Sequence, residues 1–236
     1  MKSLVENLFD DIRIKEGLKA CINCGTCTAI CPAASFYDYD PRELTVLVQN
    51  KNEQQLKNLL SSDYIWYCGE CMSCKTRCPK DNVPGLIIEA LRSLSQDTGL
   101  FIESEKGRQQ LYIKRVIGGW ILKYGYCLYL EGVGTNTHPE QGPVWDWRQK
   151  NWSETLKRLG ANYKGDGPGI LRKIPEEALE EIRKIFDETG ATARFNKIEE
   201  YSKKKAAEMN LEFGDGLDNE YFHHISTHNS NKHNRE

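Results

Sequence analysis

Cys21-Ile22-Asn23-Cys24-Gly25-Thr26-Cys27-Thr28-Ala29-Ile30-Cys31-Pro32 is the stretch that decides the fold of this chain, and its spacing occurs twice. The second copy is Cys68-Gly69-Glu70-Cys71-Met72-Ser73-Cys74-Lys75-Thr76-Arg77-Cys78-Pro79. Both copies read C-x2-C-x2-C-x3-C-P, and the matched cysteines (21 and 68, 24 and 71, 27 and 74, 31 and 78) share one offset along the chain. Two copies in register indicate an internal repeat with a common chemical purpose.

The spacing is the one by which bacterial-type ferredoxins hold 4Fe-4S clusters. In two-cluster ferredoxins, three cysteines of one motif bind a cluster and the fourth cysteine binds the other cluster. We therefore expect two 4Fe-4S clusters with exchanged ligands. The first cluster would take Cys21, Cys24, Cys27 and Cys78, and the second would take Cys68, Cys71, Cys74 and Cys31.

A pair of zinc sites is the alternative interpretation of the eight cysteines. Structural zinc sites usually combine two C-x2-C pairs that lie well apart in the sequence. Here four cysteines are crowded into each motif, each motif ends in Cys-Pro, and the pattern recurs. These three features favour iron–sulfur clusters over zinc.

The bulk composition describes a polar chain with little net charge. The 236 residues are 39% hydrophobic and 28% charged, and the net charge is −2. A nucleic-acid-binding domain is expected to be clearly basic, so we expect no nucleic-acid partner. The first residues contain no apolar signal segment, and no apolar run is long enough to span a membrane. We therefore expect a cytoplasmic protein, whose reduced thiols suit metal binding better than disulfides.

The first part of the chain is predicted to be helical around the cysteine motifs. Ser3 and Glu6 form a capping-box pattern at the start of a helix that is expected to end near Gly17. Asp40-Pro41 predicts a second helix start, and Pro84 opens another helix that ends near Gly99. A short helix is also expected over 53–60. The fold class is thus all-α, with a helical ferredoxin domain over residues 1–100.

The remaining chain is predicted to be a helical extension over 101–213 that docks to a partner, followed by a flexible tail over 214–236. An amphipathic pattern over 105–130 predicts a docking or core helix, with a peripheral membrane-surface helix as the alternative. A loop is expected over 131–152. Its tryptophans are expected either to fill a crevice between parts of the chain or to contact a partner. These tryptophans are Trp145, Trp147 and Trp152. Further helices are expected over 153–159, 175–189 and 193–209.

The other potentially reactive residues are not predicted to form a site. Cys127 is expected to be a buried structural thiol. The histidines His138, His223, His224, His228 and His233 lie outside the motifs. No nucleophile–base–orienting set is visible, so we expect no catalytic residue.

At the paired motifs the chain resembles the C subunit of heterodisulfide reductases. The resemblance rests on Cys24-Gly25-Thr26-Cys27, Cys31-Pro32 and Cys68-Gly69-Glu70-Cys71, with a helical insert between the motifs. It covers about residues 1–100. The longer region that follows is more similar to the versions found in sulfur-oxidising heterodisulfide reductase-like complexes.

The resemblance implies a non-catalytic electron-transfer component of an oxidoreductase complex. Its partners would be the flavin subunit, which carries flavin and iron–sulfur clusters, and the catalytic subunit, which carries Cys-Cys-Gly motifs. This chain has no Cys-Cys-Gly sequence, so cleavage of a disulfide is not expected of it. Two alternatives are an independent ferredoxin-type carrier and the iron–sulfur subunit of another respiratory dehydrogenase, of the fumarate reductase, glycolate or glycerol-phosphate type.

Overall fold

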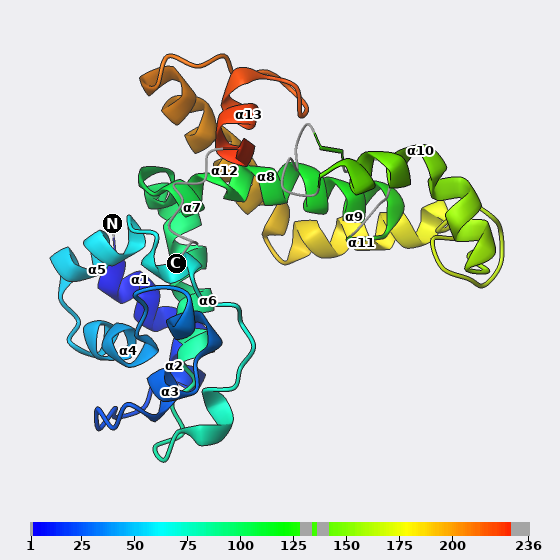
Figure 1. Cartoon of the computed structure of the whole chain (residues 1–236). Coiled ribbons are helices and arrows are strands. Elements are labelled where there is room, and N and C mark those ends of the chain that lie inside the picture. Colours follow the sequence, from blue (N-terminus) through cyan, green and yellow to red (C-terminus); the bar gives the residue numbers. More distant parts are fainter. Residues whose placement is uncertain (1, 128–133, 136–141, 228–236) are drawn as a thin grey trace. The chain divides into compact units, whose positions relative to one another are not determined.

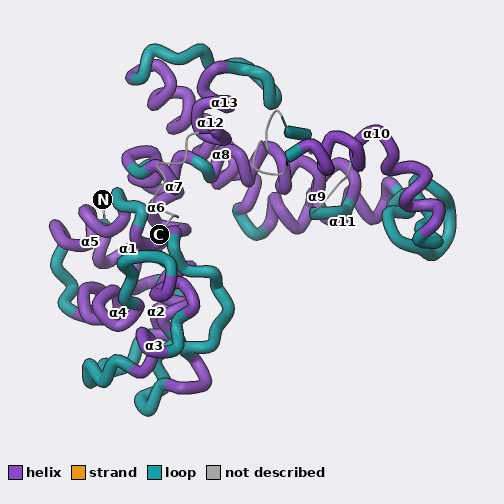
Figure 2. The backbone as a smooth tube through the Cα atoms, in the orientation of Figure 1, coloured by secondary structure: helices purple, strands orange, loops and turns teal. Residues whose placement is uncertain are grey.

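The computed structural model describes residues 2–127, 134–135 and 142–227 (Figure 1). Within those ranges the protein is built from helices and connecting loops and contains no strand (Figure 2). The predicted all-α fold class is therefore confirmed. The chain divides between Arg108 and Gln109 into two compact units, and each is considered by itself.

The first unit consists of short helices joined by the two cysteine loops, and it continues beyond residue 100. Its α-helices are α1 (Leu4–Asp10), α2 (Ile12–Gly17), α3 (Thr26–Ala29), α4 (Pro41–Gln49), α5 (Glu53–Leu60), α6 (Pro84–Thr98) and α7 (Glu105–Arg108). Single 3-10 turns are η1 (Pro32–Ser35), η2 (Tyr64–Trp66), η3 (Lys75–Arg77) and η4 (Leu100–Glu103). The central helix α6 packs against α1, α2, α4 and α5.

The helix ends in this unit follow the predicted capping residues. The Ser3 hydroxyl accepts a hydrogen bond from the Glu6 amide, and the Glu6 carboxylate accepts one from the Ser3 amide. Asp40 caps α4, with Pro41 in the first position, and Gly99 ends α6 with a φ of 80°. One prediction needs correction, because the first helix is broken at Asp11. Its carboxylate accepts from the Arg13 amide and starts α2 anew.

A continuous apolar core holds the first unit together. Leu44, Leu60 and Leu91, from α4, α5 and α6, each have no exposed surface. Leu8 and Ile14, from the two N-terminal helices, are buried in the same cluster. In α4, α5 and α6 the buried positions recur with helical spacing, so one face of each of these helices points into the core. This core supports the cysteine loops on relatively rigid elements.

The second unit is also helical in the part that the structure describes. It contains α8 (Gln110–Ile113), the π-helical turn η5 (Lys114–Gly118), α9 (Gly119–Tyr124), α10 (Pro143–Arg158), α11 (Glu176–Glu188), α12 (Ala191–Glu208) and α13 (Glu220–Thr227). The apolar side chains of Leu111, Val116 and Trp120 are buried here. The amphipathic pattern after residue 105 therefore serves packing within the chain. No helix within the described ranges is both long and apolar enough to traverse a lipid bilayer.

Two predictions for the second unit are wrong, and the start of one predicted helix is misplaced. The tryptophan segment is largely helical, because Pro143 opens α10 and Trp145, Trp147 and Trp152 all lie on it. The expected short helix at 153–159 is the end of that same helix. Within the predicted tail, Glu220–Thr227 form α13, whose Tyr221 and Phe222 are fully buried. Packing of these rings supplies stability that local periodicity did not reveal. Residues 228–236 lie outside the described residues.

Candidate iron–sulfur centre

The eight motif cysteines line two neighbouring cavities in the first unit. The first cavity is lined by three cysteines of the first motif and the last cysteine of the second motif, namely Cys21, Cys24, Cys27 and Cys78. The second is lined by the complementary set, Cys68, Cys71, Cys74 and Cys31, and Cys27 also contributes to its wall. Their volumes, including the part open to solvent, are similar at about 360 and 390 Å³. Each cavity thus combines side chains of both motifs.

The repeat extends from the cysteine spacing to the backbone conformation. Asn23 and Gly25 have positive φ angles of 60° and 78°, and their counterparts Glu70 and Met72 have φ angles of 53° and 56°. Three of these four are not glycine, and the left-handed region is uncommon and strained for such residues. The same alternation in both copies turns each loop tightly enough to direct successive cysteines into one cavity.

The hydrogen bonds to sulfur also repeat. The Asn23 amide donates to Cys21 Sγ at 3.4 Å, and the Glu70 amide donates to Cys68 Sγ at 3.3 Å. Hydroxyl groups lie beside the second cysteine of each motif, Thr26 at 3.4 Å from Cys24 Sγ and Ser73 at 3.5 Å from Cys71 Sγ. Amide donors aimed at sulfur stabilise thiolates, the form that binds metal, and a neighbouring hydroxyl can donate in the same way once the thiol has lost its proton.

The motif thiols fall into two groups, buried and exposed, whose pKa values are shifted in opposite directions. Desolvation raises the pKa of Cys27 to about 11, and it also raises the pKa values of Cys68 and Cys74. The pKa values of the exposed thiols Cys24 and Cys71 are lowered, first by the neighbouring Thr26 and Ser73 hydroxyls. A buried thiolate is expensive without a counter-charge, so the buried cysteines favour a site in which a metal supplies positive charge.

Helix α6 anchors the loop of the second motif. The Arg92 guanidinium donates to the backbone oxygen of Cys68 at 2.6 Å and to that of Ile65 at 2.8 Å. It also forms an ion pair with Glu70 and lies 5.5 Å from the centre of the Trp66 ring. Arg92 therefore connects the second loop to the core helix. This role was not predicted, because nothing local in the sequence marks Arg92 as distinct from other surface arginines.

The first motif is anchored by backbone contacts instead. The Cys21 amide donates to Gln49 Oε1 at 2.9 Å, and the Val83 amide donates to the Gly17 oxygen at 2.7 Å. A Cβ atom on Gly17 would lie 3.0 Å from Leu86 Cβ, so a glycine permits this close approach. These contacts bring the start of the first motif beside the end of the second, where Cys78 lies.

Two buried polar atoms without a hydrogen-bond partner line the cavities. Asn82, whose Nδ2 atom is unpaired, lines the first cavity, and Tyr39, whose Oη atom is unpaired, lines the second. The residues are only 2% and 4% exposed. Such donors are rare in folded proteins because leaving them unsatisfied costs about 1–3 kcal/mol. Eight thiols and two unpaired donors around two cavities fit a group that brings its own acceptor atoms, as the sulfides of a 4Fe-4S cluster do.

The residues outside the motifs do not add a further metal site. Cys127 is exposed, so its predicted burial is wrong. It lies just past Gly125, the glycine that ends α9. His223 contacts Asp218 at 2.9 Å. His138, His228 and His233 lie outside the described residues. Within residues 2–127, 134–135 and 142–227, no three His, Cys, Asp or Glu side chains are grouped closely enough to hold a single metal ion.

Comparison with known proteins agrees with this site. Residues 17–82 match the family model described as a 4Fe-4S dicluster domain. The chain is 31% identical over 146 residues to the second iron–sulfur C subunit of the CoB--CoM heterodisulfide reductase of Methanocaldococcus jannaschii, a match that covers 60% of this chain and 72% of that protein. The chain belongs to the family of heterodisulfide reductase C subunits. The predicted resemblance is therefore confirmed.

Two further relatives show how far the similarity to this family extends. The C subunit of the ferredoxin:CoB-CoM heterodisulfide reductase of Methanosarcina acetivorans is 41% identical over 104 residues. That match covers 43% of this chain and only 40% of the relative. A protein of Archaeoglobus profundus, described as similar to the C subunit of heterodisulfide reductase, is 25% identical over 177 residues, or 74% of each chain. The chain is thus shown to be an iron–sulfur protein of this family. The highest identity, 41%, belongs to the shortest of the three matches.

Proposed function

We propose that this chain relays electrons through two 4Fe-4S clusters within a heterodisulfide reductase-like complex. Its partners would be the flavin subunit, which also bears iron–sulfur clusters, and the catalytic subunit with Cys-Cys-Gly motifs. The proposal rests above all on the paired cavities, each lined by three cysteines of one motif and one of the other. A bound 4Fe-4S cluster supplies one-electron redox chemistry. The chain itself supplies thiolate ligands, donors to sulfur and a short separation between the two sites.

The close approach of the two cavities supports a relay. Cys27 and Pro84 line both of them, so the two sites are direct neighbours. In this proposal the chain passes electrons on, and the reaction with substrate is assigned to a partner.

Metal analysis tests the cofactor. Protein purified without oxygen should contain about eight iron atoms and about eight sulfides per chain. Stoichiometric zinc without sulfide would overturn the proposal.

Paired cysteine variants test the exchange of ligands. Cys24→Ser and Cys78→Ser should alter the same electron paramagnetic resonance signal, because both residues are assigned to the first cluster. Cys71→Ser and Cys31→Ser should alter the other signal. If Cys78→Ser instead alters the signal that Cys71→Ser alters, the ligands are not exchanged.

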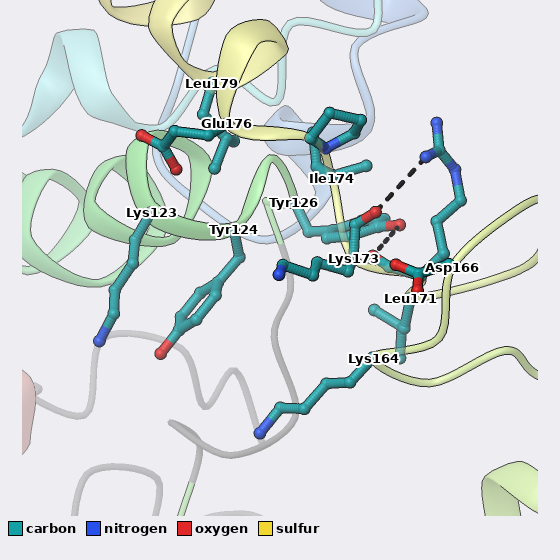
Figure 3. Close-up of a pocket in the computed structure, with 12 residues that line it drawn as sticks. Lys123, Tyr124, Tyr126, Lys164, Asp166, Leu171, Lys173, Ile174, Glu176 and Leu179 are labelled. Carbon is teal, nitrogen blue, oxygen red and sulfur yellow. Dashed lines mark hydrogen bonds between the residues drawn. The ribbon is translucent and has the colours of Figure 1, made fainter.

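The second unit is proposed to dock to the other subunits. Helix α10 exposes 75% of Val144 and 59% of Trp147, and large apolar side chains of this kind are common at interface centres. A hollow of about 1160 Å³, including the part open to solvent, is lined in the same unit by Lys123, Lys164, Arg172 and Lys173 but by only two carboxylates, Asp166 and Glu176. Figure 3 shows Lys123 on one segment of the lining and Lys164 and Lys173 on another. An acidic partner surface would complement this excess of positive charge.

Copurification from the native source tests the assembly. The wild-type chain should bring down the flavin and catalytic subunits, whereas a Val144→Ala/Trp147→Ala double variant should bring down less of them while keeping its iron. Ile12→Ala is the matched control, because Ile12 is 64% exposed but lies in the first unit. A chain that remains a monomer in native extracts would favour the alternative of an independent carrier.

A further inference from the structure

The two unpaired donors in the cavity walls have an orientation that the surrounding structure fixes. Asn82 Oδ1 accepts a hydrogen bond from the Lys19 amide at 2.7 Å. Since an amide oxygen is needed there, the nitrogen Nδ2 must be the atom left over. The Asn82 backbone amide donates to Cys78 Sγ at 3.3 Å. The residue is therefore held from two sides beside a ligand of the first cluster.

Tyr39 occupies the corresponding place in the second cavity. Its ring is fixed by neighbouring aromatic rings, with centroids 5.1 Å away in Tyr64 and 6.3 Å away in Tyr67. Its hydroxyl is buried without a hydrogen-bond partner, and a phenol hydroxyl can donate one hydrogen bond toward sulfur.

We propose that Asn82 Nδ2 and Tyr39 Oη donate hydrogen bonds to cluster sulfur, one donor for each cluster, and so set the two reduction potentials separately. This inference rests on the proposed function, because it requires the clusters to be bound. Both residues are positioning residues that act through sulfur. A donor to sulfur stabilises the more negative, reduced cluster and raises its potential. Burial increases the effect, because water does not compete for the donor.

The remaining walls of the two cavities are unlike. The first also carries the side chains of Arg42 and Lys80, and Arg42 is paired with Asp40 at 2.6 Å. The second is lined instead by Ala33, Pro41 and Ile88. Positive charge favours the reduced state of a nearby cluster, whereas an apolar wall does not. Besides the cysteines, the second cavity carries the hydroxyls of Ser73 and Tyr39. The Ser73 hydroxyl is already paired with Cys71 Sγ, so the Tyr39 hydroxyl is the unpaired polar group that can act on the potential.

Tyr39→Phe removes only the hydroxyl and is the sharpest test. Redox titration followed by electron paramagnetic resonance should show an equilibrium constant for reduction of the second cluster that is about tenfold lower, a decrease of about 59 mV for a one-electron couple. The first cluster should keep its potential. Tyr37→Phe is the matched control, because Tyr37 stacks on Tyr67 at 4.3 Å but lines neither cavity.

Asn82→Asp tests the first cavity in the same way. Aspartate keeps Oδ1 for the Lys19 amide but replaces the donor by a carboxylate oxygen, so the potential of the first cluster should fall by more than in the tyrosine variant. The second cluster should be unaffected.

The outcomes separate this inference from the function on which it rests. Variants that keep about eight irons but show unchanged potentials would overturn the tuning role and leave the cluster assignment intact. Wild-type protein without iron and sulfide would overturn the assignment itself. If Tyr39→Phe fails to retain its second cluster while Tyr37→Phe retains both, Tyr39 is needed for assembly, and its role as a tuning donor is rejected. Deuterium coupling measured in D₂O provides an independent readout, because the coupled deuteron of the second cluster should disappear in Tyr39→Phe.

Discussion

In the first unit, helices with fully buried Leu44, Leu60 and Leu91 surround two loops that point thiols into open cavities. The second unit has no such loops in its described part. There, Arg115 of η5 pairs with Glu199 of α12 at 2.7 Å and donates to the backbone oxygens of Gly214 and Gly216. The first unit therefore depends on its core and on what its loops bind, whereas the second depends on contacts between its own helices and the segment before α13. Treatments that act on one kind of interaction should affect one unit and spare the other.

Removal of the iron should produce the largest difference between the units. Asn23, Glu70 and Met72 hold left-handed backbone conformations, each of which costs about 1–3 kcal/mol. Ligand binding offsets such strain, and structural metal sites contribute on the order of 10 kcal/mol. Chelation after oxidation should therefore remove hydrogen-exchange protection from the loops around both motifs. Protection in α11 and α12 should persist, and equal loss in both units would contradict the comparison.

A substitution that creates a cavity in the core of the first unit should have the next largest effect on stability. Leu44 of α4 has no exposed surface, so Leu44→Ala should reduce the free energy of unfolding of this unit by about 3 kcal/mol. This change in unfolding free energy is measured by urea unfolding of the cluster-bound protein, monitored through hydrogen exchange of the backbone amides in α4 and α6. Ile12→Ala is the control, with a change within about 0.5 kcal/mol, because Ile12 is 64% exposed. An effect of Leu44→Ala below about 1 kcal/mol would mean that the clusters alone hold the unit.

The same contrast explains what could be predicted from the sequence. In the first unit the decisive signals are local: Asp40-Pro41 starts α4, Gly99 ends α6, and the cysteine spacing indicates which thiols share a cavity. Short-range capping and turn geometry determine such features, so they can be read without the fold. Asn82 and Tyr39 could not be recognised as cavity-wall donors, because burial and the unpaired atom become visible only after folding.

In the second unit the decisive contacts join distant segments. The buried ring of Phe222 stacks on Tyr112, far earlier in the chain, with centroids 5.4 Å apart. The buried ring of Tyr221 packs against Phe213, in the segment before α13. The polar residues on either side of Tyr221 and Phe222, among them Glu220, His223 and His224, obscure the helical period, which is why this stretch was predicted to be a tail. For Trp147, the surrounding glycines and prolines suggested a loop, although Pro143 is well placed to open a helix.

Loss of Arg115 should destabilise the second unit and spare the first. The Arg115 side chain is only 7% exposed, and its removal leaves Glu199 and two backbone oxygens with fewer partners. Arg115→Met should lower the free energy of unfolding by about 2 kcal/mol, the size expected for hydrogen bonds to a charged group. Hydrogen exchange in α12 and α13 measures the effect. Arg158→Met is the control, because its pair with Glu154 is 77% and 65% exposed and should contribute under about 0.5 kcal/mol.

Lowering the pH should reduce the stability of the second unit through protonation of Glu199. This is the smallest of the four predicted effects. Burial raises the pKa of Glu199, but hydrogen bonds from Arg115 and Lys114 more than compensate, and the pKa lies below its ordinary value of 4.5. A carboxylate whose pKa is lower in the folded state stabilises the fold fully above pH 4.5, and this contribution is lost as the pH falls through the folded-state pKa. The difference in unfolding free energy between wild type and Glu199→Gln should therefore be constant near neutral pH and shrink in acid. A difference that does not change with pH would show that Glu199 is not paired in the folded unit. The second unit would then be stabilised by packing without this ion pair. The bound clusters would be the remaining difference between the two units.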